Sequence, residues 1–230
     1  KDLDIETASE SDGREVLFWV GCAGAFDPGA QKVVQATAKL MQRAGVKFTV
    51  LGPKESCTGD PARRMGDEFQ FQQLAETNIA TLKSIGTKKI VTQCPHCLQS
   101  LKNEYGQLGG DFDVVHHTEF LQQLRTDGRL KFANNFQKSI AYHDPCFLAR
   151  VNGITSPPRQ LLTSASESSI LEPDRRESKT FCCGAGGGRM WMEEDKSQRP
   201  GIERAKELVD TGAKTVAVGC PFCKVMVGDG

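Results

Sequence analysis

The chain has 230 residues, of which 38% are hydrophobic and 25% charged, a composition typical of a folded globular protein. Its 29 basic residues balance its 29 acidic residues, which argues against a polyanion-binding surface, so nucleic acid is not an expected partner. No apolar stretch approaches the roughly 20 residues of a membrane-spanning helix, and no signal-peptide pattern opens the chain. The chain begins with Lys1, so we expect it to be part of a longer polypeptide in which residues 1–13 form a linker.

The first half of the sequence alternates predicted strands with predicted helices. Apolar runs predict four strands, at residues 14–22, 46–51, 88–93 and 112–117. Apolar residues at helical spacing predict helices at residues 30–44, 66–85 and 118–125, with a further short helix after Pro95. In the helix over 66–85, one face carries six apolar residues, and Gly86 follows as the expected C-terminal cap. The six are Phe71, Leu74, Ala75, Ile79, Leu82 and Ile85.

The second half repeats this order. A helix is predicted with Ile202, Ala205, Leu208 and Val209 on its buried face and Gly212 at its end, followed by a strand in residues 213–219. We interpret the serine-rich stretch 164–180 as a strand at 169–171 and an extended loop inside the second lobe. The boundary between lobes is expected near residues 127–137. Strands alternating with helices indicate an α/β fold with two similar lobes, residues 14–130 and 138–230, each a small parallel sheet flanked by helices.

Nine cysteines are spaced in a way that reveals an internal duplication. Thirty-four residues separate Cys22 from Cys57, and 35 separate Cys146 from Cys182. The sequence "CTG" follows in the first half and "CCG" in the second, and each half ends in a C-x-x-C pair, "CPHC" at 94–97 and "CPFC" at 220–223. An odd number of cysteines excludes a fully paired disulfide framework, and we expect metal-bound thiolates in a reducing compartment.

The second half offers five cysteines, one more than a tetrahedral zinc ion needs. Four of the nine cysteines follow predicted strands, and the carboxyl ends of parallel strands meet at one edge of a sheet. Vicinal thiolates on a glycine-rich seat can bind different metal atoms, while the backbone N–H groups of Gly184, Gly186, Gly187 and Gly188 approach the sulfur charge. This pattern favours a polynuclear cluster over a single ion.

The paired pattern resembles the cysteine-rich (CCG) domain pair of the heterodisulfide reductase catalytic subunit family. The motifs "ESCTGDPARR", "HDPCFLAR", "FCCGAGGGRMWMEE" and "CPFCKVM" carry the resemblance, which extends over the chain from about Val16. That family includes iron–sulfur subunits of glycolate and lactate oxidation systems. The motifs are most similar to the C-terminal part of its membrane-anchored electron-transfer-flavoprotein:menaquinone oxidoreductases.

The resemblance implies an oxidoreductase domain with a noncubane [4Fe-4S] cluster in the second lobe. Electrons would pass from electron-transfer flavoprotein toward menaquinone, through a membrane quinone-reducing domain in the same or a partner chain. The protein would then lie at the cytoplasmic face of the cell membrane. The implied ligands are the five cysteines of the second lobe: Cys146, Cys182, Cys183, Cys220 and Cys223.

The first motif departs from this pattern, because Thr58 stands where the second vicinal cysteine would be. Cys22, Cys57, Cys94 and Cys97 remain, enough for a cubane [4Fe-4S] cluster, a zinc ion, or a vestigial site without metal. Three other functions stay open: heterodisulfide-reductase-like cleavage of a disulfide at the cluster, an iron–sulfur subunit of a glycolate or lactate oxidation system, and a zinc-stapled binding module. A thioredoxin-type dithiol is disfavoured, because it leaves Cys146 and the vicinal pair unexplained.

No catalytic residue is assigned from the sequence. For His143 and Asp144 we favour hydrogen bonding of a strand-end turn over proton donation. His96 lies inside the first C-x-x-C pair, but Phe222 takes the matching place in the second, so a ligand role is not expected. Structural roles are expected for four more residues, namely His116, His117, Met190 and Trp191. Three arginines follow the cysteine–glycine turns: Arg63, Arg64 and Arg189. They could offset the negative charge of a cluster or form ion pairs on the surface, and both roles stay open.

Overall fold

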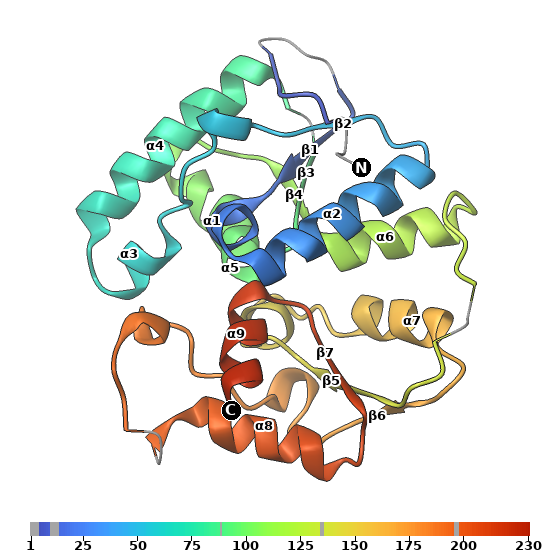
Figure 1. The fold of residues 1–230 in the computed structure, drawn as a ribbon. Helices are drawn as coiled ribbons and strands as arrows, with labels where there is room; N and C mark the ends of the chain where they lie inside the picture. Colours follow the sequence, from blue (N-terminus) through green and yellow to red (C-terminus); the bar gives the residue numbers. More distant parts are fainter. Residues whose placement is uncertain (1–4, 10–13, 88, 134–135, 196–197) are drawn as a thin grey trace. The chain divides into compact units, whose positions relative to one another are not determined.

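The structure, a computed structural model, describes residues 5–9, 14–87, 89–133, 136–195 and 198–230. The chain divides into two units, Lys1–Leu130 and Lys131–Gly230, each with its own sheet (Figure 1). We call these units the first lobe and the second lobe. Among the described residues, no helix combines the length and the apolar character that a membrane span requires.

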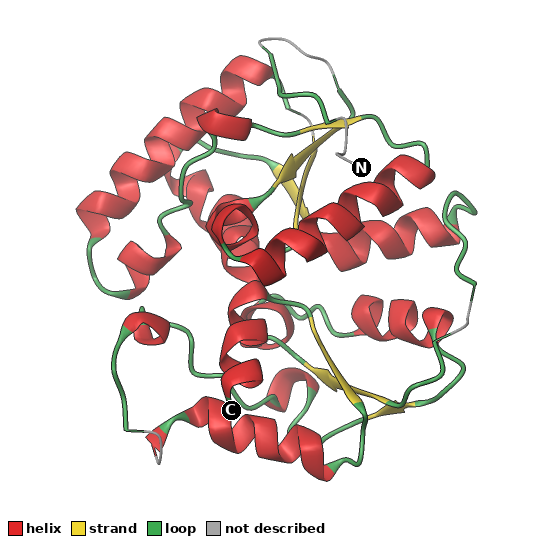
Figure 2. Ribbon diagram, viewed as in Figure 1, coloured by secondary structure: helices red, strands yellow, loops and turns green. Residues whose placement is uncertain are grey.

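The first lobe contains a four-stranded parallel sheet in the order β2-β1-β3-β4. Its central strand, β1, is buried along its whole length, because helices cover both faces of the sheet (Figure 2). In register, Phe18 of β1 lies opposite Val91 of β3. The strands are β1 (Val16–Trp19), β2 (Phe48–Thr49), β3 (Lys89–Thr92) and β4 (Asp113–His116).

Helices of the first lobe begin and end at residues suited to those positions. The Asp27 carboxylate accepts the Ala30 N–H at 2.6 Å where α2 begins, and Asp67 does the same for Gln70 at α4. Gly86 ends α4 in the left-handed conformation, as predicted. The helices are α1 (Gly21–Phe26), α2 (Pro28–Arg43), α3 (Asp60–Arg64), α4 (Glu68–Ile85), α5 (Pro95–Gln99) and α6 (His117–Thr126), with a π-helical turn η2 (Ser100–Glu104) after α5.

The second lobe repeats the first three strands in a parallel sheet of order β6-β5-β7. Its strands are β5 (Ile140–His143), β6 (Ile170–Leu171) and β7 (Thr215–Val218). Its helices are α7 (Ser156–Ala165), α8 (Pro200–Asp210) and α9 (Pro221–Asp229), with short turns η4 (Phe147–Val151), η5 (Glu177–Lys179) and η6 (Arg189–Trp191). Within the described residues, the second lobe has no counterpart of β4 and α6.

The predicted fold class is confirmed: two similar α/β lobes, each a small parallel sheet flanked by helices. Several strands are shorter than predicted, and the strand expected over residues 46–51 is reduced to Phe48–Thr49. Of the segment expected to be a linker, residues 1–4 and 10–13 lie outside the described residues. In its described part, Thr7 pairs with Val50 and the Ala8 N–H donates to the Val50 carbonyl at 2.8 Å, so this part contacts the first lobe.

The predicted buried face of α8 is partly wrong. Ala205 and Leu208 are buried as expected, but Ile202 is 37% exposed and Val209 is 66% exposed. Arg204 is fully buried instead, at 0% exposure, because its guanidinium finds polar partners on neighbouring segments. The stretch 164–180 does belong to the second lobe, since β6 pairs with β5.

Candidate metal centres

Five cysteines of the second lobe gather where the strands of its sheet end. Cys146 follows β5, and Cys220 is the N-terminal cap of α9, directly after β7. Cys223 lies in the first turn of α9. Cys182 and Cys183 lie in the loop that comes after β6 and η5. Three strand ends therefore bring together residues up to 77 positions apart in sequence, from Cys146 to Cys223.

The five thiols form one continuous series of contacts. The sulfur atoms of Cys146 and Cys182 are 3.8 Å apart. Further thiol–thiol hydrogen bonds join Cys182 to Cys183, Cys183 to Cys223, and Cys223 to Cys220. All five residues singled out in the sequence belong to this series.

Contacts within the series make the thiols unequal in acidity. Hydrogen bonds from Cys146 and Cys183 lower the pKa of Cys182 far below its usual value. The contact with Cys182 in turn raises the pKa of Cys146, and contacts with Cys183 and Cys220 raise that of Cys223. One thiolate thus opposes ionisation of its neighbours, and all five can be thiolates together only around bound cations. The donor set fits a metal centre with several positive charges.

The glycine-rich loop supplies backbone donors to both vicinal cysteines. Gly184 N–H donates to Cys182 Sγ at 3.3 Å, and Ala185 N–H forms the equivalent bond to Cys183. Gly184 has a φ of +88°, a conformation that side chains rarely adopt, and a Cβ there would lie 3.3 Å from Pro200. At Gly184 glycine is therefore required by the turn that directs these two N–H groups at sulfur.

The first lobe brings its four cysteines together in the matching places. Cys22 contacts Cys57, and Cys94 contacts Cys97, through thiol–thiol hydrogen bonds. The contact between these two thiols raises the pKa of Cys22 and lowers that of Cys57, and the charge of Cys94 acts on both, which indicates that the two pairs are close. Gly59, with a φ of +83°, donates its N–H to Cys57 Sγ at 3.4 Å, as Gly184 does to Cys182.

Thr58 takes the place of the second vicinal cysteine in three dimensions as well as in sequence. Its hydroxyl lies 4.0 Å from Cys97 Sγ, the counterpart of the contact between Cys183 and Cys223. The side chain is buried. The first lobe therefore keeps the architecture of the second with a hydroxyl in place of one thiol.

Both cysteine sets lie in segments that match a single family model, the cysteine-rich domain named CCG. The matches cover residues 16–102 and 140–228, one in each lobe. The chain belongs to the CCG family. The two CCG lobes are copies of one domain, which confirms the duplication inferred from the cysteine spacing.

Curated relatives of this CCG pair are oxidoreductases or their iron–sulfur subunits. The chain is 41% identical to "Probable iron-sulfur-binding oxidoreductase FadF" of Bacillus subtilis, over 100% of the chain and 33% of the relative. It is 40% identical to "EtfAB:quinone oxidoreductase" of Syntrophomonas wolfei, over 95% and 32%. One polypeptide of the CoB–CoM heterodisulfide reductase of Methanosarcina acetivorans is 32% identical, over 96% and 55%. The chain thus spans about a third of the length of the first two.

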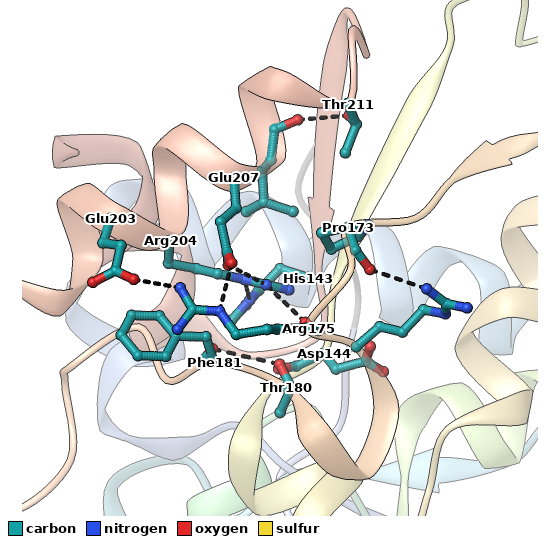
Figure 3. Close-up of polar contacts among 12 residues, drawn as sticks. His143, Asp144, Pro173, Arg175, Thr180, Phe181, Glu203, Arg204, Glu207 and Thr211 are labelled. Atoms are coloured by element: carbon teal, nitrogen blue, oxygen red, sulfur yellow. Dashed lines mark hydrogen bonds and ion pairs between the residues drawn. The ribbon is translucent and has the colours of Figure 1, made fainter.

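Polar residues around the second CCG centre are tied together by hydrogen bonds and ion pairs, among which Figure 3 shows those that join His143, Arg204, Arg175 and Glu207. The Asp144 carboxylate accepts two hydrogen bonds from Arg159, at 2.8 and 2.7 Å, and one from the Glu177 N–H at 2.8 Å. Asp144 thus fixes the turn after β5, in line with the turn-bonding interpretation. His143 accepts a hydrogen bond from Arg204, a residue that the apolar pattern of α8 gives no reason to single out.

Polar residues around the first CCG centre are also paired. His96 Nδ1 lies 2.7 Å from the buried Asp60 carboxylate. Arg64 forms ion pairs with Asp60 and Glu104. Other residues singled out in the sequence also have protein partners. His116 bonds Thr118 and the Gln93 carbonyl, as expected of a structural residue, and His117 bonds Thr92. Arg63 forms ion pairs with Glu68 and Glu104, Arg189 forms an ion pair with Glu194, and Trp191 packs against Phe222.

A cavity of about 410 Å³ opens beside the first centre. Cys22, Cys57 and Glu55 line it together with apolar residues that include Phe26 and Pro53. The Glu55 carboxylate accepts the Val20 N–H at 3.0 Å and the Gly21 N–H at 2.5 Å. Sequence reasoning missed this cavity, because its residues come from α1 and from the segment 50–57, which only the fold brings together.

Proposed function

We propose that the second lobe binds a noncubane [4Fe-4S] cluster through its five cysteines and works as an electron-transfer domain. The observation that carries the proposal is the single series of thiol contacts from Cys146 to Cys220, with the vicinal pair in its middle. A zinc ion takes four ligands and would leave one of these thiols unused. When bound, such a cluster supplies one-electron redox chemistry.

Residues of the chain would hold the cluster and compensate its charge. Cys183, Cys220 and Cys223 are buried and keep water from that side, whereas Cys146 and Cys182 are partly exposed. We infer that electrons enter and leave on the side of Cys146 and Cys182, where a partner can approach. The N–H groups of Gly184 and Ala185 would stabilise the added negative charge.

For the first lobe we propose a metal centre on Cys22, Cys57, Cys94 and Cys97. Four thiols suit either a cubane [4Fe-4S] cluster or a zinc ion. Thr58 argues against a second noncubane cluster, because it supplies a hydroxyl where the second lobe supplies its fifth thiol. Iron and zinc analysis of the wild type and of Cys57→Ser would distinguish the two, because the metal that is lost in the variant is the one bound in the first lobe.

We further propose that the chain forms the iron–sulfur part of a respiratory oxidoreductase. Electrons would pass from electron-transfer flavoprotein toward menaquinone, through a membrane quinone-reducing domain in the same or a partner chain, at the cytoplasmic face of the cell membrane. The 40% identity to a protein named EtfAB:quinone oxidoreductase supports this assignment.

A second candidate function is reductive cleavage of a disulfide. Two observations favour it: the relatives include a polypeptide of a heterodisulfide reductase, and a cavity beside Cys22 and Cys57 could admit a small substrate. The two functions predict different reactions of the same protein. Electron transfer needs a protein donor and a quinone, whereas disulfide cleavage consumes two electrons and two protons and releases two thiols.

The test uses anaerobically purified protein and reduced electron-transfer flavoprotein. We expect the flavoprotein to reduce the iron–sulfur centre rapidly, as followed by freeze-quench electron paramagnetic resonance. A centre reduced by dithionite but not by the flavoprotein would contradict the proposed donor. Thiol release from a disulfide in the presence of a chemical reductant would instead favour the second candidate, and one zinc ion without sulfide would refute both.

A further inference from the structure

Arg204 is a fully buried arginine whose partners come from three segments of the second lobe. Its Nε–H donates to His143 Nδ1 at 2.9 Å, at the end of β5 (Figure 3). Its Nη1 donates to the Arg175 carbonyl at 2.8 Å and to the Glu207 carboxylate at 2.9 Å. These bonds hold the guanidinium in one position against the histidine ring.

The bond from Arg204 decides which nitrogen of His143 carries a proton. A guanidinium has five N–H donors and no acceptor, and it does not lose its proton in proteins. His143 Nδ1 must therefore accept with a lone pair, so a neutral ring carries its proton on Nε2.

The protonated nitrogen has no partner among the described residues, although it is buried. His143 Nε2 makes no hydrogen bond there, and buried N–H groups without an acceptor are rare. The sulfur atoms of Cys183 and Cys223 lie within 4.8 Å of a ring nitrogen of His143. Since Nδ1 is already bonded to Arg204, sulfur at this corner of the centre is a candidate acceptor for Nε2–H.

We propose that His143 donates its Nε2–H to sulfur at the Cys183–Cys223 corner of the cluster and that Arg204 is the positioning residue that fixes this tautomer. The inference rests on the proposed function, because the acceptor is a cluster sulfide or a metal-bound thiolate. His143 is then not an iron ligand, since the one nitrogen that Arg204 leaves available carries a proton. A hydrogen bond to sulfur stabilises the more negative, reduced cluster and raises its reduction potential.

The first lobe supplies an independent observation at the matching position. Trp19 ends β1 three residues before Cys22, as His143 ends β5 three residues before Cys146. Its indole Nε1–H is also buried without a partner among the described residues. An indole nitrogen can donate but cannot ligate metal in this form. Both lobes thus present a ring N–H at the same place in the fold.

The tautomer can be read in the metal-free protein by long-range 1H–15N correlation spectra. We expect the protonated nitrogen of His143 to be Nε2 in the wild type and in Arg204→Lys, since lysine can still donate to Nδ1. In Arg204→Met this preference should be lost. A proton on Nδ1 in the wild type would overturn the proposal whether or not a cluster is ever bound.

The hydrogen bond itself can be tested in the cluster-loaded wild type, with 15N-histidine and pulsed electron paramagnetic resonance. Of the four histidines, only His143 lies in the second lobe, so a 15N coupling to the second-lobe signal identifies it. We expect a weak coupling together with an exchangeable proton that disappears in D2O. A strong coupling typical of an iron–nitrogen bond, or no coupling at all, would overturn the proposal.

Reduction potentials provide a third readout with matched variants. We expect His143→Phe, which removes the N–H, to shift the midpoint of the second-lobe cluster to a more negative potential. His143→Gln retains an N–H and should stay close to the wild type, and His117→Phe in the first lobe is the control. Equal potentials in all four proteins would contradict the hydrogen bond. Absence of iron and sulfide from the wild type would instead refute the proposed function, while the tautomer remains measurable.

Discussion

Asp144 joins three segments of the second lobe, so replacing its carboxylate with an amide tests how the cysteine-bearing loop is held. Its side chain is 1% exposed and accepts two hydrogen bonds from Arg159 on α7 and one from the Glu177 N–H. Asparagine has the same shape, but it has no charge, and its NH2 group must face a donor. Asp144→Asn therefore leaves at least one buried donor of Arg159 or Glu177 without an acceptor.

The size of the effect follows from the burial of this ion pair. Removing one partner of a buried, hydrogen-bonded ion pair lowers the free energy of unfolding by about 3–5 kcal/mol. With a urea m-value of about 1–3 kcal/mol/M, the unfolding midpoint of the second lobe falls by roughly 1–5 M. Glu172 is the matched control, since it binds the same Arg159 but its side chain is 25% exposed. For Glu172→Gln we expect the free energy of unfolding to fall by about 1 kcal/mol or less.

The assay is urea unfolding of the metal-free protein, with hydrogen exchange to assign each transition to a lobe. We expect amide protection of β5 and β6 to fall in Asp144→Asn and that of β1 and β3 to stay unchanged. If the free energy of unfolding falls no further in Asp144→Asn than in Glu172→Gln, the reasoning is refuted. It would mean that the turn after β5 is held by packing rather than by this carboxylate.

Three further predictions concern single residues. Gly184→Ala should lower the free energy of unfolding by about 1–2 kcal/mol and release iron, because the φ of Gly184 is +88° and Pro200 is close. Gly186→Ala should change both quantities little, and urea unfolding and iron analysis measure them. Thr58→Cys should supply a fifth thiol to the first lobe and alter the electron paramagnetic resonance of its centre. Burial lowers the pKa of His117 to about 4, below its value near 6.5 in the unfolded chain. The neutral His117 ring therefore contributes to the free energy of unfolding above pH 6.5, and this contribution is lost as the pH falls toward 4. Between pH 7 and 5 this loss is about 1–2 kcal/mol and should be smaller in His117→Gln, as measured by unfolding at each pH.

Each of these predictions has an outcome that would contradict it. Equal losses in the two glycine variants would show that the left-handed turn at Gly184 is not required. An unchanged first-lobe spectrum in Thr58→Cys would mean that the new thiol does not reach the metal. An identical pH dependence in the wild type and in His117→Gln would assign the acid sensitivity to other groups, such as the neutral His143.

The duplicated α/β fold could be predicted because its signals are local and repeated. Apolar runs marked the buried strands β1 and β3, and glycines marked the ends of α4 and α8, where Gly86 and Gly212 adopt positive φ. Cysteine spacing then aligned the two halves. The gathering of thiols at strand ends followed from the topology of a parallel sheet, in which the carboxyl ends share one edge.

The remaining features depend on partners that are distant in sequence. Arg204 is buried because His143, the Arg175 carbonyl and Glu207 accept its protons, and no pattern within α8 reveals these acceptors. No predicted element covers α7, whose Pro157 and Pro158 lie in its first turn, where a helix needs no backbone N–H. In both cases tertiary context outweighs the local signal.

The central claim is that the second-lobe thiols surround a multi-iron centre. The most direct measurement is iron and sulfide analysis, with electron paramagnetic resonance, of anaerobically purified wild type and Cys183→Ser, and with Thr58→Ser as the matched control. The account predicts iron and sulfide in equal amounts and an unusual cluster signal that disappears in Cys183→Ser and persists in Thr58→Ser. Zinc without sulfide, or a signal unchanged by Cys183→Ser, would contradict it.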